Sequence, residues 1–440
     1  MASMRSPRSS TVIVRIEEHR STRVAMPRIA AGELARAAGH RLQITPSVEP
    51  DTYEIRATQH VGSVSAGGVT VHVRPKVAID NVLLLLGAAP DEIRWGRERF
   101  GYAPDEDLVP AFVAFFARVV ERTLHRGLLR SYRPERARLR AVRGRIDFAE
   151  QLRTPGVAVP MACAFDEFTA DIALNRYLKA AVRRGLLTPG IARSVRRALM
   201  AVLVKFDEVV DEAVRVDGLD GHVFTRLDRS YEPAVRLARL LLAGEALTDR
   251  SGSLSAQAFM IDMNRLFEAF VEERLRQALR DVFDLRSQHR THLDVERRVP
   301  VRPDLVLLDG ARPVYVADVK YKLSDGGIAR HADYYQALAY ATALSLPEAL
   351  LVYCHDDGDA PPTEITVRGS GVRLVTYRLD LSGGADDLAR RTEALAAMIR
   401  DRARCQMDEC GGENLSSSCG DQAGRTICPH GPIVNTLRPS

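Results

Sequence analysis

The pattern of apolar and polar residues divides the chain into two regions and a tail. Short segments rich in β-branched residues dominate positions 11–80. Apolar residues recur at helical spacing in two later stretches, 108–125 and 172–214. We therefore predict a first domain over residues 1–250 that is β-rich over 11–80 and mostly helical over 104–250. Ser251-Gly252-Ser253 has the composition of a linker that would follow it.

The second region alternates between helices and strands. A helix is predicted from Met263 onward, because its apolar residues keep helical spacing. Runs of Val and Leu on both sides of Asp309-Gly310 predict a β-hairpin, and further strands are expected over 349–354 and 372–379. We predict a second domain over residues 255–400. The fold class of the whole chain is therefore mixed α/β.

The predicted hairpin brings charged residues together. If about five residues form its turn, the register places Asp304 opposite Asp318, and the two-residue period of a strand puts Lys320 on the same face as Asp318. The strand around Asp318 is apolar on both faces, so it is expected to be covered on both sides and its charges need partners. Mg²⁺ bound by carboxylates, water and a substrate phosphate answers that need. The alternative is a surface hairpin with a cross-strand ion pair.

The order of these residues resembles that of a known nuclease superfamily. Pro303-Asp304, a turn and then Asp318-x-Lys320 match the PD-(D/E)xK pattern. The resemblance implies a central mixed sheet flanked by helices and Mg²⁺-dependent phosphodiester hydrolysis. Asp304 and Asp318 would be metal ligands, and Lys320 would orient water and stabilise developing negative charge. Gln336 and Tyr340, on one helical face, resemble a Gln-x-x-x-Tyr motif that supports the site and contacts DNA in one branch; alternatively, both only pack.

Glu268 is our candidate for a further metal ligand. It lies one turn from Glu272 on the helix predicted from Met263. In the superfamily, an acidic residue of such a helix often joins the metal ligands. The alternative is a solvated acidic face whose members pair with Arg265 and Arg276.

A wider resemblance covers about the first 400 residues. The chain resembles the McrC family, the nuclease subunits of McrBC modification-dependent restriction systems. The segments that carry the resemblance are Val71–Lys76 with Asn81–Leu84, Gly127–Tyr132, Arg143–Ile146, Asp166–Asp171 with Leu174–Arg176, and Met263–Glu268.

This resemblance implies a partner. In the family, a hexameric AAA+ GTPase, McrB, recognises modified cytosine, assembles around the amino-terminal part of the nuclease subunit and translocates DNA, and the nuclease subunit stimulates its GTP hydrolysis. Hairpins within residues 11–79 would form the projection that enters the channel of the ring. The chain contains no Gly-x-x-x-x-Gly-Lys-Ser/Thr loop. GTP would therefore be bound by the partner.

Positive charge is concentrated in one short stretch. The net charge is only +5, but seven arginines lie between positions 130 and 145 with Glu135 as the single acid. Such a stretch would attract a polyanion and bind DNA without sequence preference, with Arg143 and Arg145 as our candidates for contact with phosphates. A solvated strand or loop and a surface facing an acidic patch on the partner are the alternatives.

Composition limits the compartment. The apolar runs are far shorter than the roughly 20 residues that span a bilayer, and the first residues have no apolar segment typical of a secretory signal, so we expect a cytoplasmic protein.

Cys163 and Cys354 lie in apolar contexts typical of reduced core thiols. The remaining cysteines occupy residues 401–440, which are rich in Gly, Ser and Asp. Their spacing does not fit structural zinc, so we expect a disordered tail.

These observations lead to one functional hypothesis and two alternatives. We expect the DNA endonuclease subunit of a GTP-dependent restriction complex directed at modified cytosine in double-stranded DNA. One alternative is a nuclease of the same superfamily that acts alone in repair or recombination. The other is a regulatory subunit that stimulates the GTPase without cutting DNA.

Overall fold

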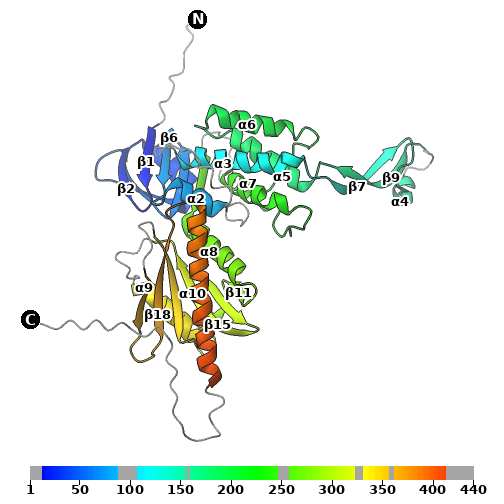
Figure 1. The fold of residues 1–440 in the computed structure, drawn as a ribbon. Coiled ribbons are helices and arrows are strands. Elements are labelled where there is room, and N and C mark those ends of the chain that lie inside the picture. The colour runs from blue at the N-terminus through cyan, green and yellow to red at the C-terminus, as the bar shows by residue number, and fades with distance from the viewer. Residues whose placement is uncertain are drawn as a thin grey trace, which may run out of the picture.

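The secondary structure forms an upper and a lower block in Figure 1. The computed structural model describes residues 12–87, 107–153, 156, 159–245, 257–322, 331–355 and 361–412. The fold is mixed α/β, as predicted from the sequence. The segment that we expected to be a linker, Ser251-Gly252-Ser253, lies outside the described residues.

The upper block begins with two sheets. One has the strand order β1-β6-β5-β10, with β1 (Val12–Glu17), β6 (Val69–Arg74), β5 (His60–Ala66) and β10 (Gln257–Asp262). The other has the order β2-β4-β3, with β2 (Ser21–Ala25), β4 (Thr52–Ala57) and β3 (Leu42–Pro46); helix α1 (Arg28–Ala38) accompanies them. We expected the second domain to begin at residue 255, but β10 pairs with β5 of the first block. The chain passes to the lower block only at Met263.

Helices form the rest of the upper block. They are α2 (Ile79–Leu86), α3 (Leu108–Thr123), α5 (Ala173–Leu186), α6 (Arg193–Val204) and α7 (Glu232–Glu245), with short 3-10 turns at Gly39–Arg41, Leu124–Arg126 and Arg229–Tyr231. Phe112 and Phe116 of α3 and Leu178 of α5 are completely buried. Their spacing on each helix places them on one apolar face, so these helices bury a common core.

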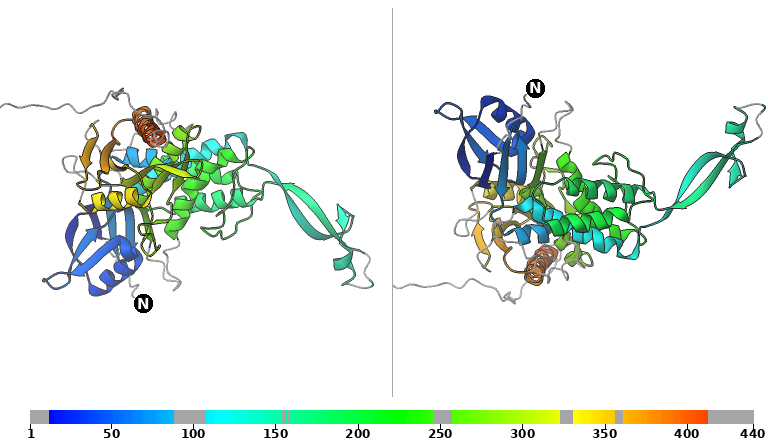
Figure 2. Two further views of the ribbon diagram at one scale, coloured as in Figure 1. Left: turned by 90° about the horizontal axis from the view of Figure 1, so that it is seen from below. Right: turned by 90° about the horizontal axis from the view of Figure 1, so that it is seen from above.

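A long arm leaves the helical part of the upper block (Figures 1 and 2). Strands β7 (Ser131–Leu139) and β9 (Met161–Thr169) pair along their whole length, which corresponds to a ribbon of about 30 Å. The tip carries β8 (Arg145–Ile146) and α4 (Phe148–Gln151). We expected the projection that enters the partner among the hairpins of residues 11–79, and this stays a prediction. Strands β5 and β6 alternate buried residues within their sheet, whereas the arm extends from the body.

The base of the arm is tied to α5. Asn175, fully buried, donates hydrogen bonds to the carbonyl oxygens of Leu129 at 2.8 Å and Ala170 at 2.6 Å, which lie where the chain enters and leaves the arm. Asp171 accepts a 2.6 Å hydrogen bond from Arg133 of β7. A two-stranded ribbon is marginally stable alone, so these contacts determine the direction in which the arm points.

The lower block is a mixed sheet with the strand order β11-β14-β15-β16-β18-β17. Its strands are β11 (Asp284–Ser287), β14 (Leu305–Asp309), β15 (Arg312–Lys320), β16 (Glu348–His355), β18 (Arg373–Asp380) and β17 (Thr363–Thr366), and a small ribbon of β12 (Thr291–His292) and β13 (Pro300–Val301) lies beside it. Strands β14 and β15 form the predicted antiparallel hairpin, whereas β15, β16 and β18 run parallel. The strands predicted over 349–354 and 372–379 correspond to β16 and β18.

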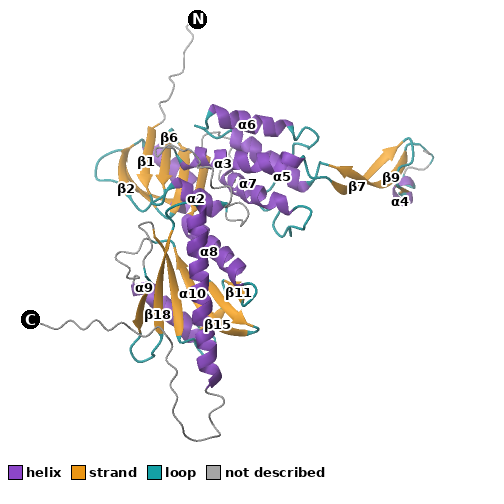
Figure 3. Ribbon diagram, viewed as in Figure 1, coloured by secondary structure: helices purple, strands orange, loops and turns teal. Residues whose placement is uncertain are grey.

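Helices cover both faces of this sheet (Figure 3). Tyr315, Ala317 and Val319 of β15 belong to the core shared with α8 (Met263–Leu279) and α10 (Ala385–Gly412). Val316 packs instead with Ala337 of α9 (His331–Ala343) on the other face. This alternation explains why β15 reads as apolar on both sides in the sequence.

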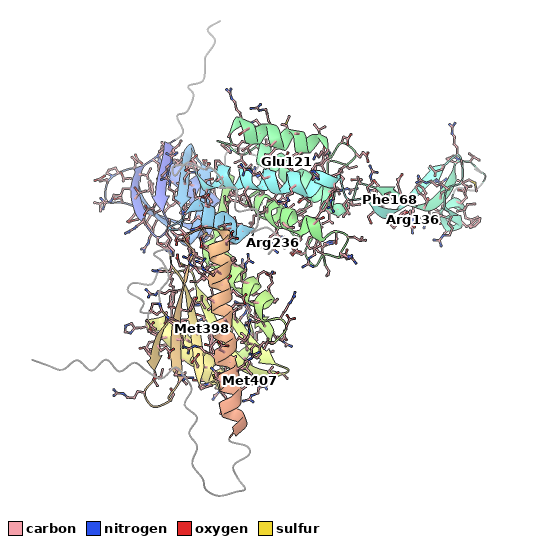
Figure 4. The ribbon with its side chains drawn as sticks, viewed as in Figure 1. Glu121, Arg136, Phe168, Arg236, Met398 and Met407 are labelled. Carbon is pink, nitrogen blue, oxygen red and sulfur yellow. The ribbon has the colours of Figure 1, made fainter. Side chains whose placement is uncertain are left out.

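Helix α10 corrects the predicted tail. We expected disorder from residue 401, but α10 continues to Gly412, and Met398 and Met407 mark its course in Figure 4. Ala403 is completely buried and Arg402 bonds to the buried Glu348, so packing against the sheet extends the helix. Residues 413–440 lie outside the described part. Cys163 and Cys354 are buried and form no disulfide, as expected. No helix in the described segments is long and apolar enough to cross a membrane.

Candidate active site

The β14–β15 hairpin brings the three signature residues together. Leu305 pairs with Ala317, so Asp304 and Asp318 occupy the next positions of the ladder. The Nζ atom of Lys320 lies 2.7 Å from Oδ2 of Asp318 and 4.0 Å from Oδ2 of Asp304. The backbone N–H of Val319 donates a 2.9 Å hydrogen bond to Asp304 Oδ2. The register expected from the sequence is therefore observed, although a two-residue turn and a register shift after Leu307, and not a five-residue turn, produce it. Two carboxylates and one ammonium converge at the end of the hairpin.

Asp318 is in an unfavourable environment for a carboxylate. The residue is 1% exposed, and the Lys320 ammonium 2.7 Å from Oδ2 is the cation that pairs with its carboxylate. Burial raises the pKa of Asp318 well above its ordinary value, and the negative charge of Asp304 adds to the shift. Burial works to lower the pKa of Lys320, but the charge of Asp318 outweighs it and raises that pKa. The ammonium therefore stays charged and compensates only part of the carboxylate charge.

These residues fit a hard divalent cation. The buried Asp318 carboxylate lies beside that of Asp304, so the pair needs positive charge beyond the single Lys320 ammonium, and Mg²⁺ commonly takes one or two carboxylates together with waters and substrate oxygens. Within the described ranges, no group of three or more His, Cys, Asp or Glu side chains is arranged to hold a metal ion. Asp304 and Asp318 are thus the protein groups placed to hold such a cation, with the other ligands left to water and substrate.

Glu268 lies at the margin of this site. Asp262 caps the first turn of α8 by accepting hydrogen bonds from the backbone N–H groups of Asn264 and Arg265, and Glu268 follows one turn later. Burial raises the pKa of Glu268 to about 7, with a further contribution from the charge of Asp304. The charges of the site therefore affect the pKa of Glu268. In the described part of the chain, Glu268 does not form a three-residue metal cluster with Asp304 and Asp318.

Glu272 forms an ion pair with Arg276, as the alternative of a paired acidic helix face predicted. Its carboxylate accepts a 2.6 Å hydrogen bond from Arg276, one turn further along α8. The charges of Asp304 and Lys320 affect the pKa of Glu268, and its role as a metal ligand stays a prediction.

The α9 residues hold the backbone that leads into Asp304. Gln336 donates a 2.6 Å hydrogen bond to the hydroxyl of Tyr340, and this hydroxyl donates at 3.1 Å to the carbonyl oxygen of Arg302. Tyr340 is 5% exposed. The four-residue spacing therefore builds a short relay from the helix to the segment just before Pro303-Asp304. This geometry suits a supporting role.

A family model describes much of the chain. The model of the McrBC 5-methylcytosine restriction system component matches residues 55–354, which include the arm and the β14–β15 hairpin. The match covers more than half of the chain. The chain belongs to this McrBC family.

Two solved structures are similar to the chain, and the first of them shares its fold. One is the Thermococcus gammatolerans refined half-complex from a tetradecameric assembly of McrB AAA+ hexamers with bound McrC, with a TM-score of 0.57 and 18% identity over 87% of this chain and 100% of that chain. Another is the cryo-EM structure of the Thermococcus gammatolerans McrBC complex, with a TM-score of 0.42 and 22% identity over 61% and 88% of the two chains. No curated protein sequence matches the chain.

Sequence reasoning missed a residue that orients Asp304 in this McrBC family member. Gln288 donates from its side chain to Asp304 Oδ1 at 2.9 Å and from its backbone N–H to the Asp304 carbonyl at 2.8 Å. It does so with a φ of 50°, which residues other than glycine rarely adopt. Nothing in the sequence marks Gln288, because it lies outside the motif and meets Asp304 only through the pairing of β11 with β14.

A second missed contact anchors α9. Lys322 Nζ lies 2.9 Å and 3.0 Å from the two carboxylate oxygens of Asp333, which also accepts a 2.5 Å hydrogen bond from Tyr353 of β16. Asp333 is 4% exposed. This cluster joins the end of β15 to the helix that carries Gln336 and Tyr340.

Arg143 and Arg145 are not part of the site. They belong to the arm, which extends away from both sheets; Arg136 and Phe168 mark this arm in Figure 4. Arg143 lies 3.4 Å from Glu167 and stacks over the Phe165 ring with its guanidinium carbon 4.2 Å from the ring centroid. Arg145 is exposed on β8. Contact of these two arginines with DNA stays a prediction, and their position also suits the alternative of a surface facing the partner.

Proposed function

We propose that this chain is the Mg²⁺-dependent DNA endonuclease subunit of a GTP-dependent restriction complex directed at modified cytosine. One observation supports this most strongly. Asp304, Asp318 and Lys320 meet at the end of a buried hairpin, where two carboxylates share a single ammonium. The alternative was an ion pair between strands of a surface hairpin. Such a pair would be exposed to solvent, whereas Asp318 is 1% exposed.

Each residue has a role in this proposal. Asp304 and Asp318 would hold Mg²⁺, which when bound supplies a Lewis acid for the phosphodiester and lowers the pKa of bound water. The Lys320 ammonium, held charged by Asp318, stabilises negative charge that develops on the phosphate and orients the attacking water. Gln288, Gln336 and Tyr340 keep Asp304 in place through the contacts described above. Glu268 would accept a proton from, or bond to, water near the cation.

The upper block would bind the partner, an AAA+ GTPase hexamer of the McrB type, and stimulate its GTP hydrolysis. Family membership supports this proposal. The arm provides a suitable element, because it projects from the body and is fixed at its base by Asn175 and Asp171. Phe148 and Leu152 are 68% and 78% exposed at its tip, beside arginines. An apolar and basic tip of this kind suits insertion into the channel of a ring.

The substrate would be double-stranded DNA in the cytoplasm, with the modified base read by the partner. Exposed Arg302 directly precedes Pro303-Asp304, and exposed Arg290 and Arg297 lie on the neighbouring β12–β13 segment. These guanidinium groups could contact phosphates on either side of the scissile bond.

Reconstitution tests the proposal. The full chain is co-purified with the AAA+ GTPase encoded beside it, and methylated and unmethylated plasmids are digested with and without Mg²⁺ and GTP. We expect cleavage only of methylated plasmid with both Mg²⁺ and GTP, and none with Asp318→Ala, which should still stimulate GTP hydrolysis.

The other outcomes identify the alternatives. Cleavage without GTP or partner would indicate a nuclease that acts alone. Stimulated GTP hydrolysis with no cleavage by the wild-type chain would indicate a regulatory subunit and refute the nuclease role.

A further inference from the structure

A lysine of the upper block reaches the catalytic strand of the lower block. Lys76 lies two residues after the end of β6, and its Nζ donates a 3.2 Å hydrogen bond to the carbonyl oxygen of Tyr321. The same ammonium lies 3.9 Å from the centroid of the Tyr321 ring. Tyr321 is the residue immediately after Lys320. One side chain thus holds both the backbone and the ring of the residue next to the signature lysine.

Glu18 completes this contact. Its backbone N–H donates a 2.9 Å hydrogen bond to the carbonyl of Arg74, which continues the β1–β6 pairing and brings Glu18 beside Lys76. The Glu18 carboxylate lies 3.4 Å from Lys76 Nζ, and its side chain is fully buried while that of Lys76 is 17% exposed. Burial raises the pKa of Glu18 to about 7, although the charge of Lys76 opposes the shift. Taking two charges out of water is costly, so this pair is a poor device for stability alone.

The contact falls where β15 leaves the sheet. The pairing of β15 with β16 ends at Lys320 and Tyr353, so Tyr321 is the first residue beyond it. On the next residue, Lys322 is held by Asp333. The backbone after Lys320 is therefore anchored twice, to α9 through Lys322 and to the amino-terminal sheet through Lys76.

Tyr321 also faces the helix that carries Glu268. The Tyr321 residue is 1% exposed, and its ring lies 6.1 Å from that of Phe267, the neighbour of Glu268 on α8. A shift of Tyr321 would move Lys320, because the two residues are adjacent in the chain. It would also displace α8, because close-packed interiors transmit displacement.

We propose that Lys76, oriented by Glu18, is a positioning residue that sets the end of β15 and couples the amino-terminal sheet to the nuclease site. Through the Tyr321 carbonyl it places the Lys320 ammonium against Asp318. Engagement of a partner by the upper block would then alter the cation site through this contact. The inference rests on the proposed nuclease function for its cleavage readout and on cation binding for a second one.

The test compares variants of the full chain. Lys76→Met keeps the length of the side chain but removes its charge and its donor, and Lys76→Arg restores both with a different geometry. Lys205→Met is the matched control, because Lys205 also donates to a backbone carbonyl, that of Leu124 at 3.3 Å, but within the helical part. Single-turnover cleavage in the reconstituted complex, GTPase stimulation and Mg²⁺ affinity by calorimetry are measured for each.

The expected pattern separates positioning from folding. Lys76→Met should cut DNA at least tenfold more slowly and bind Mg²⁺ severalfold more weakly, with GTPase stimulation and the far-ultraviolet circular dichroism unchanged. Lys76→Arg should recover part of both losses, and Lys205→Met should match the wild type. If Lys76→Met does not fold, Lys76→Arg and Glu18→Gln carry the test, each expected to show a smaller loss in the same two readouts.

Two results would overturn the coupling. One is a Lys76→Met protein that equals Lys205→Met in cleavage rate and Mg²⁺ affinity. The other is loss of cleavage only in proportion to loss of folded protein in every variant. If the wild-type chain does not cut at all, the proposed function fails by itself, and Mg²⁺ affinity across the same variants still decides the role of Lys76.

Discussion

Replacing Asp318 by Asn should make the metal-free protein more stable while abolishing cleavage. The carboxylate is 1% exposed, has the Lys320 ammonium as its ion-pair partner and lies beside Asp304. Each unit by which its pKa exceeds the unfolded value costs about 1.4 kcal/mol when the group is ionised. Loss of the 2.7 Å ion pair with Lys320 offsets part of this gain. We expect a net stabilisation of about 2 kcal/mol near pH 8.

The pH dependence has a definite sign. Because the folded pKa of Asp318 is raised, its unfavourable contribution is absent below the unfolded pKa of about 4 and grows as the pH rises toward the folded pKa. The stability advantage of Asp318→Asn should therefore be small at pH 5 and largest at pH 8.

Thermal unfolding of the metal-free chain measures this difference. The expected gain corresponds to an increase of a few degrees in the melting temperature. Asp309→Asn is the matched control, since Asp309 is exposed at the turn of the same hairpin and should change little. Added Mg²⁺ should stabilise the wild type by binding its folded state and should leave Asp318→Asn nearly unaffected.

Two outcomes would refute this reasoning. If metal-free Asp318→Asn is less stable than the wild type at pH 8, the ion pair of Asp318 with Lys320 outweighs the cost of burying its charge beside Asp304. If Mg²⁺ stabilises both proteins equally, the cation does not bind at this carboxylate.

Three further predictions test the supporting structure. Asp171→Asn should loosen the arm, because it weakens the hydrogen bonds from Arg133 and Arg176; limited proteolysis should cut the arm faster in the variant while the body stays intact. The Arg176 hydrogen bond lowers the pKa of Asp171, so in the wild type this contribution is present above pH of about 4 and should be lost as the pH falls below it. Glu348→Gln should lower the free energy of unfolding by about 3 kcal/mol in a denaturant titration, because the buried Glu348 carboxylate pairs with Arg402; an unchanged midpoint would argue against that burial cost. Tyr340→Phe keeps the ring but removes the hydroxyl that donates to the backbone before Asp304, so cleavage should fall severalfold with a loss of stability of about 1 kcal/mol, and equal cleavage would exclude a supporting role.

The arm shows the limit of local sequence patterns. The arginine-rich stretch was evident in the sequence, but nothing in it indicated that these residues belong to a projecting ribbon. The apolar residues of β5 and β6 are buried between neighbouring strands, whereas β7 exposes alternate residues along its length. Burial on one or two faces depends on what packs against a strand, and that is decided by distant parts of the chain.

The sequence by itself determined the β14–β15 hairpin and the helices that carry Glu268 and Tyr340. Short-range physics suffices there, because the two-residue period of strands and a short turn place Asp304 beside Asp318 and Lys320, and helical spacing pairs Gln336 with Tyr340. Only the tertiary structure decided that β10 belongs to the upper sheet, that α10 extends to Gly412, and that Gln288 and Lys76 reach the β14–β15 hairpin and the residue after it. These contacts join residues far apart in the chain, and no local periodicity encodes which distant surfaces will pack together.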